Sequence, residues 1–101
     1  MVKKDKFEYE KEISTQIELI ILRLRQEREK KGISQMDLAF KAGLSQNQVN
    51  YIETGKRTPN LHTILSICKA LEINPAVLFE SQDTERQQAR EAIIRLVSQY
   101  L

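Results

Sequence analysis

The sequence has few of the residues on which disulfide-rich, zinc-binding and turn-rich proteins depend. Its 101 residues include one cysteine, two prolines, three glycines and no tryptophan. The single thiol, Cys68, excludes an internal disulfide framework and a cysteine-rich zinc site, and we expect it to be a small buried side chain. The scarcity of glycine and proline leaves little material for a turn-rich β-sandwich. The length fits one small domain with room for a short appendage.

Long apolar runs and a strong charge of one sign are absent as well. The longest apolar run, Leu19–Leu22, is far too short to cross a membrane, and the charged start Met1–Lys6 lacks a signal-peptide core. The sequence therefore predicts a cytoplasmic chain without a membrane partner. Its 16 basic and 14 acidic residues nearly balance. A nucleic-acid binder of this composition has to use a local arrangement of charge, and the surplus is centred on residues 31–60.

Signals for the start and the end of helices recur at short intervals and predict an all-α fold. The starts have a Ser, Thr or Asn that can cap the first turn, namely Thr15, Ser34, Ser45, Asn60 and Asn74. The ends are marked by Gly32, Gly43 and Gly55, where a left-handed residue can stop a helix. Apolar residues between these marks have helical spacing. We expect an N-terminal extension at residues 1–13, five short helices over 14–80, and a sixth from about residue 84 to 100.

The centre of the chain has the layout of two short helices joined by a tight turn. One helix is expected from Ser34 to Lys41 and the next from Ser45 to about Thr54, with the turn Ala42-Gly43-Leu44 between them. This order is typical of the helix-turn-helix, whose second helix lies in the major groove of DNA.

Residues from about 20 to 79 contain a long series of residues in one register. The series is Arg28-x-x-x-Gly32-Ile33-Ser34-Gln35-x-x-Leu38-Ala39-x-x-Ala42-Gly43-Leu44-Ser45, then Val49-x-x-Ile52-Glu53-x-Gly55-x-Arg57-x-Pro59, and finally Ala70-Leu71-x-Ile73-x-x-x-x-Leu78-Phe79. This series resembles the Cro/cI-type helix-turn-helix of the xenobiotic-response-element (XRE) family. The resemblance implies a five-helix, lambda-repressor-like DNA-binding domain over residues 14–80. It also implies a structural ion pair between Arg28, late in the first helix, and Glu53, at the end of the third.

The expected recognition helix carries amide side chains at its start. Amides combine a donor with an acceptor and can therefore pair with N6 and N7 of adenine or with other base edges. Four side chains are candidates for base contacts: Gln46, Asn47, Asn50 and Tyr51. The resemblance to phage repressors implies that Gln46 and Asn47 lie over bases and that Tyr51 reaches a base or a sugar. The alternative is a surface of solvated amides that touches no DNA.

Four more side chains are candidates for contacts with the DNA backbone: Gln35, Gln48, Lys56 and Arg57. Lys56 and Arg57 lie in the loop after the recognition helix, where cations set affinity and register without reading sequence. The resemblance implies a phosphate contact for Gln35, at the start of the preceding helix. Gln48 is also the capping partner of Ser45, and the basic loop has an alternative as plain solvated surface.

The last segment has a continuous apolar stripe along one helical face. Its residues are Ala89, Ile93, Leu96, Val97 and Tyr100, at spacings i, i+4, i+7, i+8 and i+11. The five-helix unit before it is complete at Phe79, so the stripe needs a partner. It can pack on its own domain or meet the same helix of a second chain. We expect the second, because helix-turn-helix proteins read palindromes as twofold dimers, and Ile93, Leu96, Val97 and Tyr100 are then the dimer interface.

The sequence thus predicts a dimeric, sequence-specific regulator of transcription that binds double-stranded DNA at a palindromic operator, with repression as the expected sign. Its size also suits a restriction-modification controller. The alternative is an antitoxin, or the protein-interaction module of a toxin–antitoxin pair, whose helical tail binds the toxin. An enzyme lacks support, because the sequence has no nucleophile–base pair, metal cluster or phosphate-binding glycine loop. We expect no cofactor, no metal and no small-molecule effector.

Overall fold

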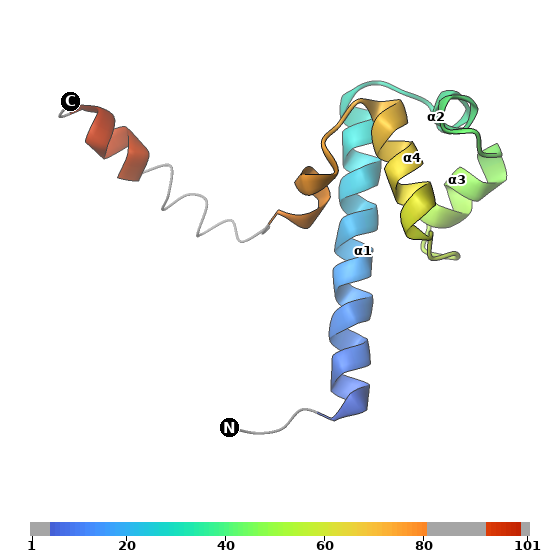
Figure 1. Ribbon diagram of the computed structural model, residues 1–101, viewed down its shortest axis with the longest axis horizontal. Helices are drawn as coiled ribbons and strands as arrows, with labels where there is room; N and C mark the ends of the chain where they lie inside the picture. Colours follow the sequence, from blue (N-terminus) through green and yellow to red (C-terminus); the bar gives the residue numbers. More distant parts are fainter. Residues whose placement is uncertain (1–4, 81–92, 100–101) are drawn as a thin grey trace.

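The computed structural model describes residues 5–80 and 93–99, and all regular elements within these ranges are helical. The predicted all-α fold is confirmed. The elements are α1 (Lys6–Lys30), α2 (Gln35–Ala42), α3 (Gln46–Glu53), α4 (Leu61–Leu71) and the 3-10 helix η1 (Pro75–Phe79), followed by a helical segment at 93–99. Figure 1 shows α2, α3 and α4 beside the C-terminal half of α1, while the N-terminal half of α1 extends beyond them.

Four of the five predicted helix starts are present, and each has the predicted cap. The side-chain oxygens accept from backbone N–H groups at 3.0 Å (Ser34 from Asp37), 3.1 Å (Ser45 from Gln48), 2.8 Å (Asn60 from Thr63) and 3.0 Å (Asn74 from Ala76). A cap satisfies a donor that the first turn of a helix leaves unpaired, and it contributes about 1 kcal/mol to stability. These short-range rules therefore decide where α2, α3, α4 and η1 begin.

The predicted start of the first helix near residue 14 is wrong, because α1 begins at Lys6. Asp5 caps this helix and accepts from the N–H of Glu8 at 2.9 Å. Thr15 lies inside α1, where its Oγ1 donates to the carbonyl of Lys11 at 3.0 Å. A Thr-x-x-Glu motif starts a helix only where the preceding residues are not themselves helical. No glycine or proline interrupts residues 6–14, so the helix runs through the motif.

Two further details differ from what the sequence indicated. The last of the five elements, η1, is a single 3-10 helix and not an α-helix. The end of α4 has a left-handed residue that is not glycine, since Glu72 has a φ of 57°. The N–H of Ile73 donates to the carbonyl of Cys68 at 3.0 Å and closes this end of α4.

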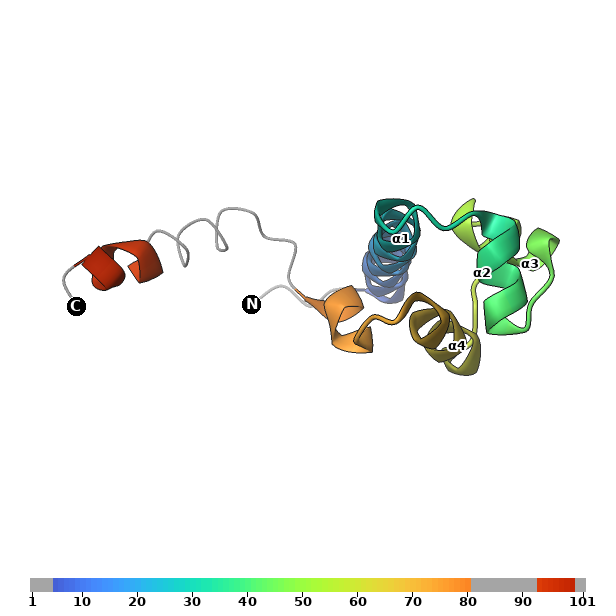
Figure 2. The same ribbon diagram turned by 90° about the horizontal axis from the view of Figure 1, so that it is seen from above.

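The core lies between α1 and the helices beside it. α2 packs on both α3 and α4, and α1 packs on α3, α4 and η1. Figures 1 and 2 both show η1 across α1 from α3. The buried apolar side chains are Ile21, Leu24, Leu38, Ala39, Val49, Ile52, Ile67, Cys68, Leu71 and Leu78. α3 contributes Val49 and Ile52 to this core, and their packing fixes its place on the domain.

Cys68 belongs to this core, as its sequence context predicted. Its side chain is 1% exposed, and burial raises the pKa of its thiol. Burial disfavours the charged thiolate, so the group stays protonated and behaves as a small apolar side chain.

Candidate nucleic-acid interface

The turn between α2 and α3 is fixed by backbone conformation and by a capping box. Gly43 ends α2 with a φ of 72°, a left-handed conformation that residues with a Cβ rarely adopt. The N–H of Leu44 donates to the carbonyl of Ala39 at 2.8 Å. At the start of α3, Ser45 Oγ accepts from the N–H of Gln48, and the Ser45 N–H donates to Gln48 Oε1 at 2.8 Å. The angle between the two helices is therefore set within three residues.

α3 has one buried face and one exposed polar face. Val49 and Ile52 are 1% and 4% exposed and pack in the core. The opposite face, which we call the reading face, consists of Gln46, Asn47, Asn50 and Tyr51. Gln46, Asn47 and Tyr51 are exposed, and Asn50 is half-buried. The structure thus places the four candidates for base contacts together, because residues one, two, five and six of an α-helix lie on the same side.

A buried ion pair joins α3 to α1. Arg28 Nε lies 2.6 Å from Glu53 Oε2, and Arg28 Nη2 donates to Glu53 Oε1 at 2.8 Å, which is the bidentate arrangement of a guanidinium and a carboxylate. The side chains are 10% and 5% exposed. A third bond runs from Arg28 Nη1 to the carbonyl of Ile33 at 2.7 Å. The hydrogen bond with Glu53 raises the pKa of Arg28, although burial acts in the opposite direction. We call this pair the Arg28–Glu53 clamp.

Gln35, the first residue of α2, contacts the clamp and the reading face at once. Its Nε2 donates to Glu53 Oε1 at 3.1 Å and lies 3.5 Å from Asn50 Oδ1. Both Gln35 and Asn50 are half-buried. The sequence predicts a phosphate contact for Gln35 and a base contact for Asn50, and the structure brings these two side chains together at Gln35 Nε2, which also contacts Glu53.

The loop after α3 folds back on the end of that helix. The N–H groups of Lys56 and Arg57 both donate to the carbonyl of Tyr51, at 2.9 and 3.1 Å. Lys56 Nζ lies 5.8 Å from the centre of the Tyr51 ring, within the range of a cation–π contact. Lys56 and Arg57 are exposed. Two cations thus flank the reading face at its C-terminal side. Gln48, the remaining candidate for a backbone contact, is half-buried and has its side-chain oxygen on Ser45.

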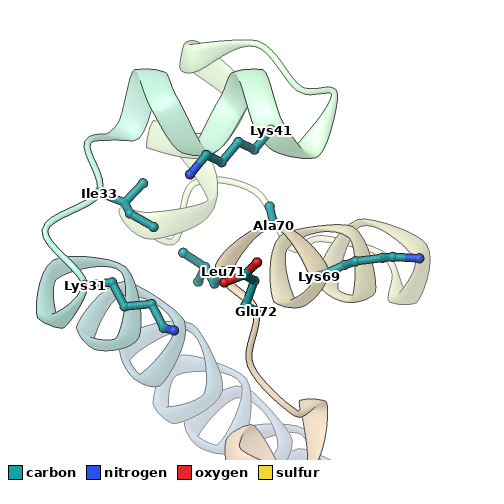
Figure 3. Close-up of a pocket in the computed structure, with 7 residues that line it drawn as sticks. All are labelled: Lys31, Ile33, Lys41, Lys69, Ala70, Leu71 and Glu72. Atoms are coloured by element: carbon teal, nitrogen blue, oxygen red, sulfur yellow. The ribbon is translucent and has the colours of Figure 1, made fainter.

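A second group of cations lies around a hollow of about 580 Å³ that contains no residue of α3. Its lining residues are Lys31, Ile33, Lys41, Lys69, Ala70, Leu71 and Glu72. In Figure 3, Lys31 and Lys41 extend toward the hollow, with the Glu72 carboxylate between them. Lys41 and Lys69 lie in the last turns of α2 and α4, where cations are favoured by the helix dipole. The sequence does not reveal this grouping, because no motif links residues so far apart in the chain.

The helical segment at 93–99 exposes its apolar side chains. Ile93, Ile94, Leu96 and Val97 are between 51% and 61% exposed. Three of the four residues predicted for a dimer interface are therefore uncovered in this chain. The fourth, Tyr100, lies outside the described residues. Clusters of this kind on a monomer commonly mark an interaction surface.

Residues 5–80 and 93–99 hold no group of three or more His, Cys, Asp or Glu side chains that could bind a metal ion. None of the helices in those ranges is long and apolar enough to cross a bilayer.

The chain resembles proteins whose names refer to regulation of transcription. It is 32% identical over 75 residues to an HTH-type transcriptional regulator of Mycobacterium tuberculosis, an alignment that covers 70% of this chain. The chain spans only about half, 54%, of the length of that relative.

The solved structures that share the fold include a controller protein and a repressor. The restriction-modification controller protein C.AhdI from Aeromonas hydrophila is 40% identical, with a TM-score of 0.59 over 61% of this chain and 94% of the controller. The P22 c2 repressor, crystallised with a synthetic operator, is 32% identical, with a TM-score of 0.54 over 59% of this chain and 91% of the repressor. The helix-turn-helix family model matches residues 24–78, which is more than half of the chain. The protein belongs to the helix-turn-helix family, in its XRE (Cro/cI-type) branch.

Proposed function

We propose that this chain is a sequence-specific regulator of transcription that binds double-stranded DNA and performs no catalysis. The observation that carries the proposal is the two-sided nature of α3, whose polar reading face is exposed while its other face is locked in the core. A helix with side chains is about 10–12 Å across and the major groove of B-DNA is about 12 Å wide, so α3 fits the groove. The neighbour crystallised with an operator, the P22 c2 repressor, supports this assignment.

Base edges are read by the amides at the start of α3. Gln46 and Asn47 are exposed there and can each offer a donor and an acceptor to one base edge. Tyr51 and Asn50 lie one turn later on the same face and reach the next bases or a sugar. This arrangement follows the general docking of a recognition helix, whose N-terminal residues contact the bases.

Contacts with the DNA backbone fix the position of the reading face. Lys56 and Arg57 neutralise phosphates beside α3, which adds affinity without sequence preference. Gln48 adds a contact through its amide nitrogen, because its oxygen is already bonded to the N–H of Ser45. The cations around the hollow at Lys41 and Lys69 take no part in this interface.

The active form is a homodimer that joins two copies through the helix at 93–99. Pairing Ile93, Leu96 and Val97, continued by Tyr100, covers an apolar surface that a single chain leaves exposed. A twofold dimer places two recognition helices about 34 Å apart, so the matching operator is a palindrome. The protein acts as a repressor in the cytoplasm, and its similarity to the P22 c2 repressor supports that sign.

Selection of bound duplexes from a random pool tests DNA recognition. We expect one palindromic sequence to be enriched, with half-sites about 10 base pairs apart. The same selection with Gln46→Ala and Asn47→Ala combined should lose the preference at the base pairs that these two amides contact, while a matched change on α1, Gln26→Ala, should enrich the wild-type site. Enrichment of no sequence by the wild-type chain would contradict the proposal.

Analytical ultracentrifugation tests the dimer. The wild-type chain should sediment as a dimer, and Leu96→Asp should sediment as a monomer, because the interface would have to bury an unpaired charge. Ser98→Asp adds the same charge at a polar position of the same segment and should leave the dimer intact. A wild-type chain that is monomeric at tens of micromolar, or that copurifies with a different protein in a fixed ratio, would contradict the homodimer.

A further inference from the structure

We propose that the Arg28–Glu53 clamp fixes the direction of the hydrogen bonds that the neighbouring amides offer to DNA, so that Asn50 presents its nitrogen and selects guanine. Gln35 is then a positioning residue for Asn50. This inference rests on the proposed function, since it concerns how the reading face distinguishes bases.

Glu53 determines which groups around it donate hydrogen bonds, because an ionised carboxylate can only accept them. Arg28 has donors and no acceptor, and two of its nitrogens bond the two oxygens of Glu53 at 2.6 and 2.8 Å. The Glu53 side chain is 5% exposed, so water has little access to these oxygens and does not replace the protein donors. Any other group that contacts Glu53 must therefore donate.

Gln35 is the group that does so. Its amide lies 3.1 Å from Glu53 Oε1, and only the NH₂ end can face the carboxylate, because the reversed amide would place two acceptors against each other. The same nitrogen is 3.5 Å from Asn50 Oδ1, so its two N–H bonds are directed at Glu53 and at Asn50. Its oxygen is left for the DNA side. Phosphates only accept, so the phosphate contact expected of Gln35 has no donor left in that side chain.

Gln35 in turn determines which end of the Asn50 amide is free. Its Oδ1 faces the Gln35 nitrogen, which leaves the NH₂ group of Asn50 to contact the groove. In the major groove guanine offers two acceptors, N7 and O6, and no donor, whereas cytosine offers only the N4 donor. Adenine pairs best with an amide whose oxygen is also free, and that of Asn50 is engaged. Guanine is therefore the base that matches Asn50 best, and cytosine is the base that it rejects.

The experiment compares the sites selected from a random duplex pool by the wild type and three variants. At one guanine of the wild-type site, an analogue that lacks N7 or O6 should lower the affinity of the wild-type protein for the duplex about tenfold. Asn50→Ala should be insensitive to that analogue, which identifies the base that Asn50 contacts. Asn50→Asp, which can only accept, should enrich cytosine at that position and leave the rest of the site unchanged.

Gln35→Met tests the positioning role, because it keeps the length of the side chain and removes the amide. The preference for guanine over adenine at the Asn50 position should fall several-fold, while affinity for unrelated duplexes stays as in the wild type. A purely structural role for Gln35 would change thermal stability without moving this ratio. Gln26→Glu on α1 is the control for an added carboxylate outside the interface, and it should select the wild-type site.

The outcomes separate this inference from the proposed function. Failure of the wild-type chain to enrich any sequence would overturn the DNA-binding function itself. Three other outcomes would overturn only the inference. Asn50→Asp could enrich the same site as the wild type, or the wild-type site could have cytosine or no preference at the Asn50 position. The third outcome is a guanine-to-adenine ratio that is unchanged in Gln35→Met.

Discussion

The two ends of α3 differ in what holds their side chains. At the C-terminal end, Glu53 is almost completely buried and bonded to Arg28 and Gln35. At the N-terminal end, Gln46 and Asn47 are exposed, and only the backbone near them is fixed by the cap at Ser45. Eight residues of α-helix span about 12 Å, so this change takes place within little more than two turns. One short helix thus uses different residues to hold its position and, in the proposed function, to contact DNA.

Disruption of the buried end should have the largest effect. Glu53→Ala leaves the charge of Arg28 buried without its partner, which should lower the free energy of unfolding by about 3–5 kcal/mol. Urea denaturation measures this loss. The pair Arg28→Met with Glu53→Leu removes both charges and should recover most of the stability. A loss below about 1 kcal/mol for Glu53→Ala would mean that the clamp does not hold α3.

Changes at the exposed end should affect binding and not folding. Gln46→Ala and Asn47→Ala should each weaken binding to the selected operator by about 1–3 kcal/mol and relax the preference at one or two base pairs. Fluorescence anisotropy on the operator and on single-base variants measures both effects. The denaturation midpoint should stay at the wild-type value, since neither side chain is buried. Unchanged affinity and preference in either variant would remove that residue from the reading face.

Loss of the cap at Ser45 should have an intermediate effect on stability. Ser45→Ala removes the acceptor of the Gln48 N–H, and we expect a cost of about 1 kcal/mol in the free energy of unfolding. Ser34→Ala removes the equivalent cap of α2 and should cost a similar amount. In Ser45→Ala the backbone N–H of residue 45 still donates to Gln48 Oε1, so only the bond from the Gln48 N–H to Ser45 Oγ is lost. Because Ser45 caps α3 and Ser34 caps α2, Ser45→Ala should weaken operator binding more than Ser34→Ala does. Equal operator affinities for the two capping variants would show that the start of α3 is ordered without its capping box.

Substitution of the loop cations should give the smallest effect. Lys56→Ala and Arg57→Ala should each reduce the slope of log affinity against log salt by about 1, on all duplexes alike. Titrations at several salt concentrations on the operator and on an unrelated duplex measure this slope. Lys41→Ala in the hollow is the matched control and should leave the slope unchanged. A loss confined to the operator would show that the loop side chains contact bases.

Local rules in the sequence were sufficient for most of the fold. The caps at Ser34, Ser45, Asn60 and Asn74 depend on residues two or three positions away, and all four are present. The period of the α-helix likewise places the candidate residues of α3 on one face. The start of α1 was mispredicted, because the same kind of motif at Thr15 is overridden by the helix that precedes it.

Local rules of this kind could not predict the contacts of Gln35. Its partners Asn50 and Glu53 are 15 and 18 residues away, on a different helix. Whether they meet depends on the angle between α2 and α3 and on the depth at which the Arg28–Glu53 clamp holds α3. Composition and periodicity carry neither quantity, so the sequence assigned Gln35 and Asn50 to separate tasks.

The covered thiol in α4 makes this protein convenient for site-specific labelling. An exposed thiolate is the nucleophile that attacks thiol reagents, whereas Cys68 is shielded by the core and is kept protonated because burial raises its pKa. A cysteine introduced on the surface, as in Gln26→Cys, should therefore be the fast-reacting thiol of the chain without any change to the core. A fluorophore or spin label at that position would report the separation of the two protomers of the proposed homodimer on one DNA duplex directly.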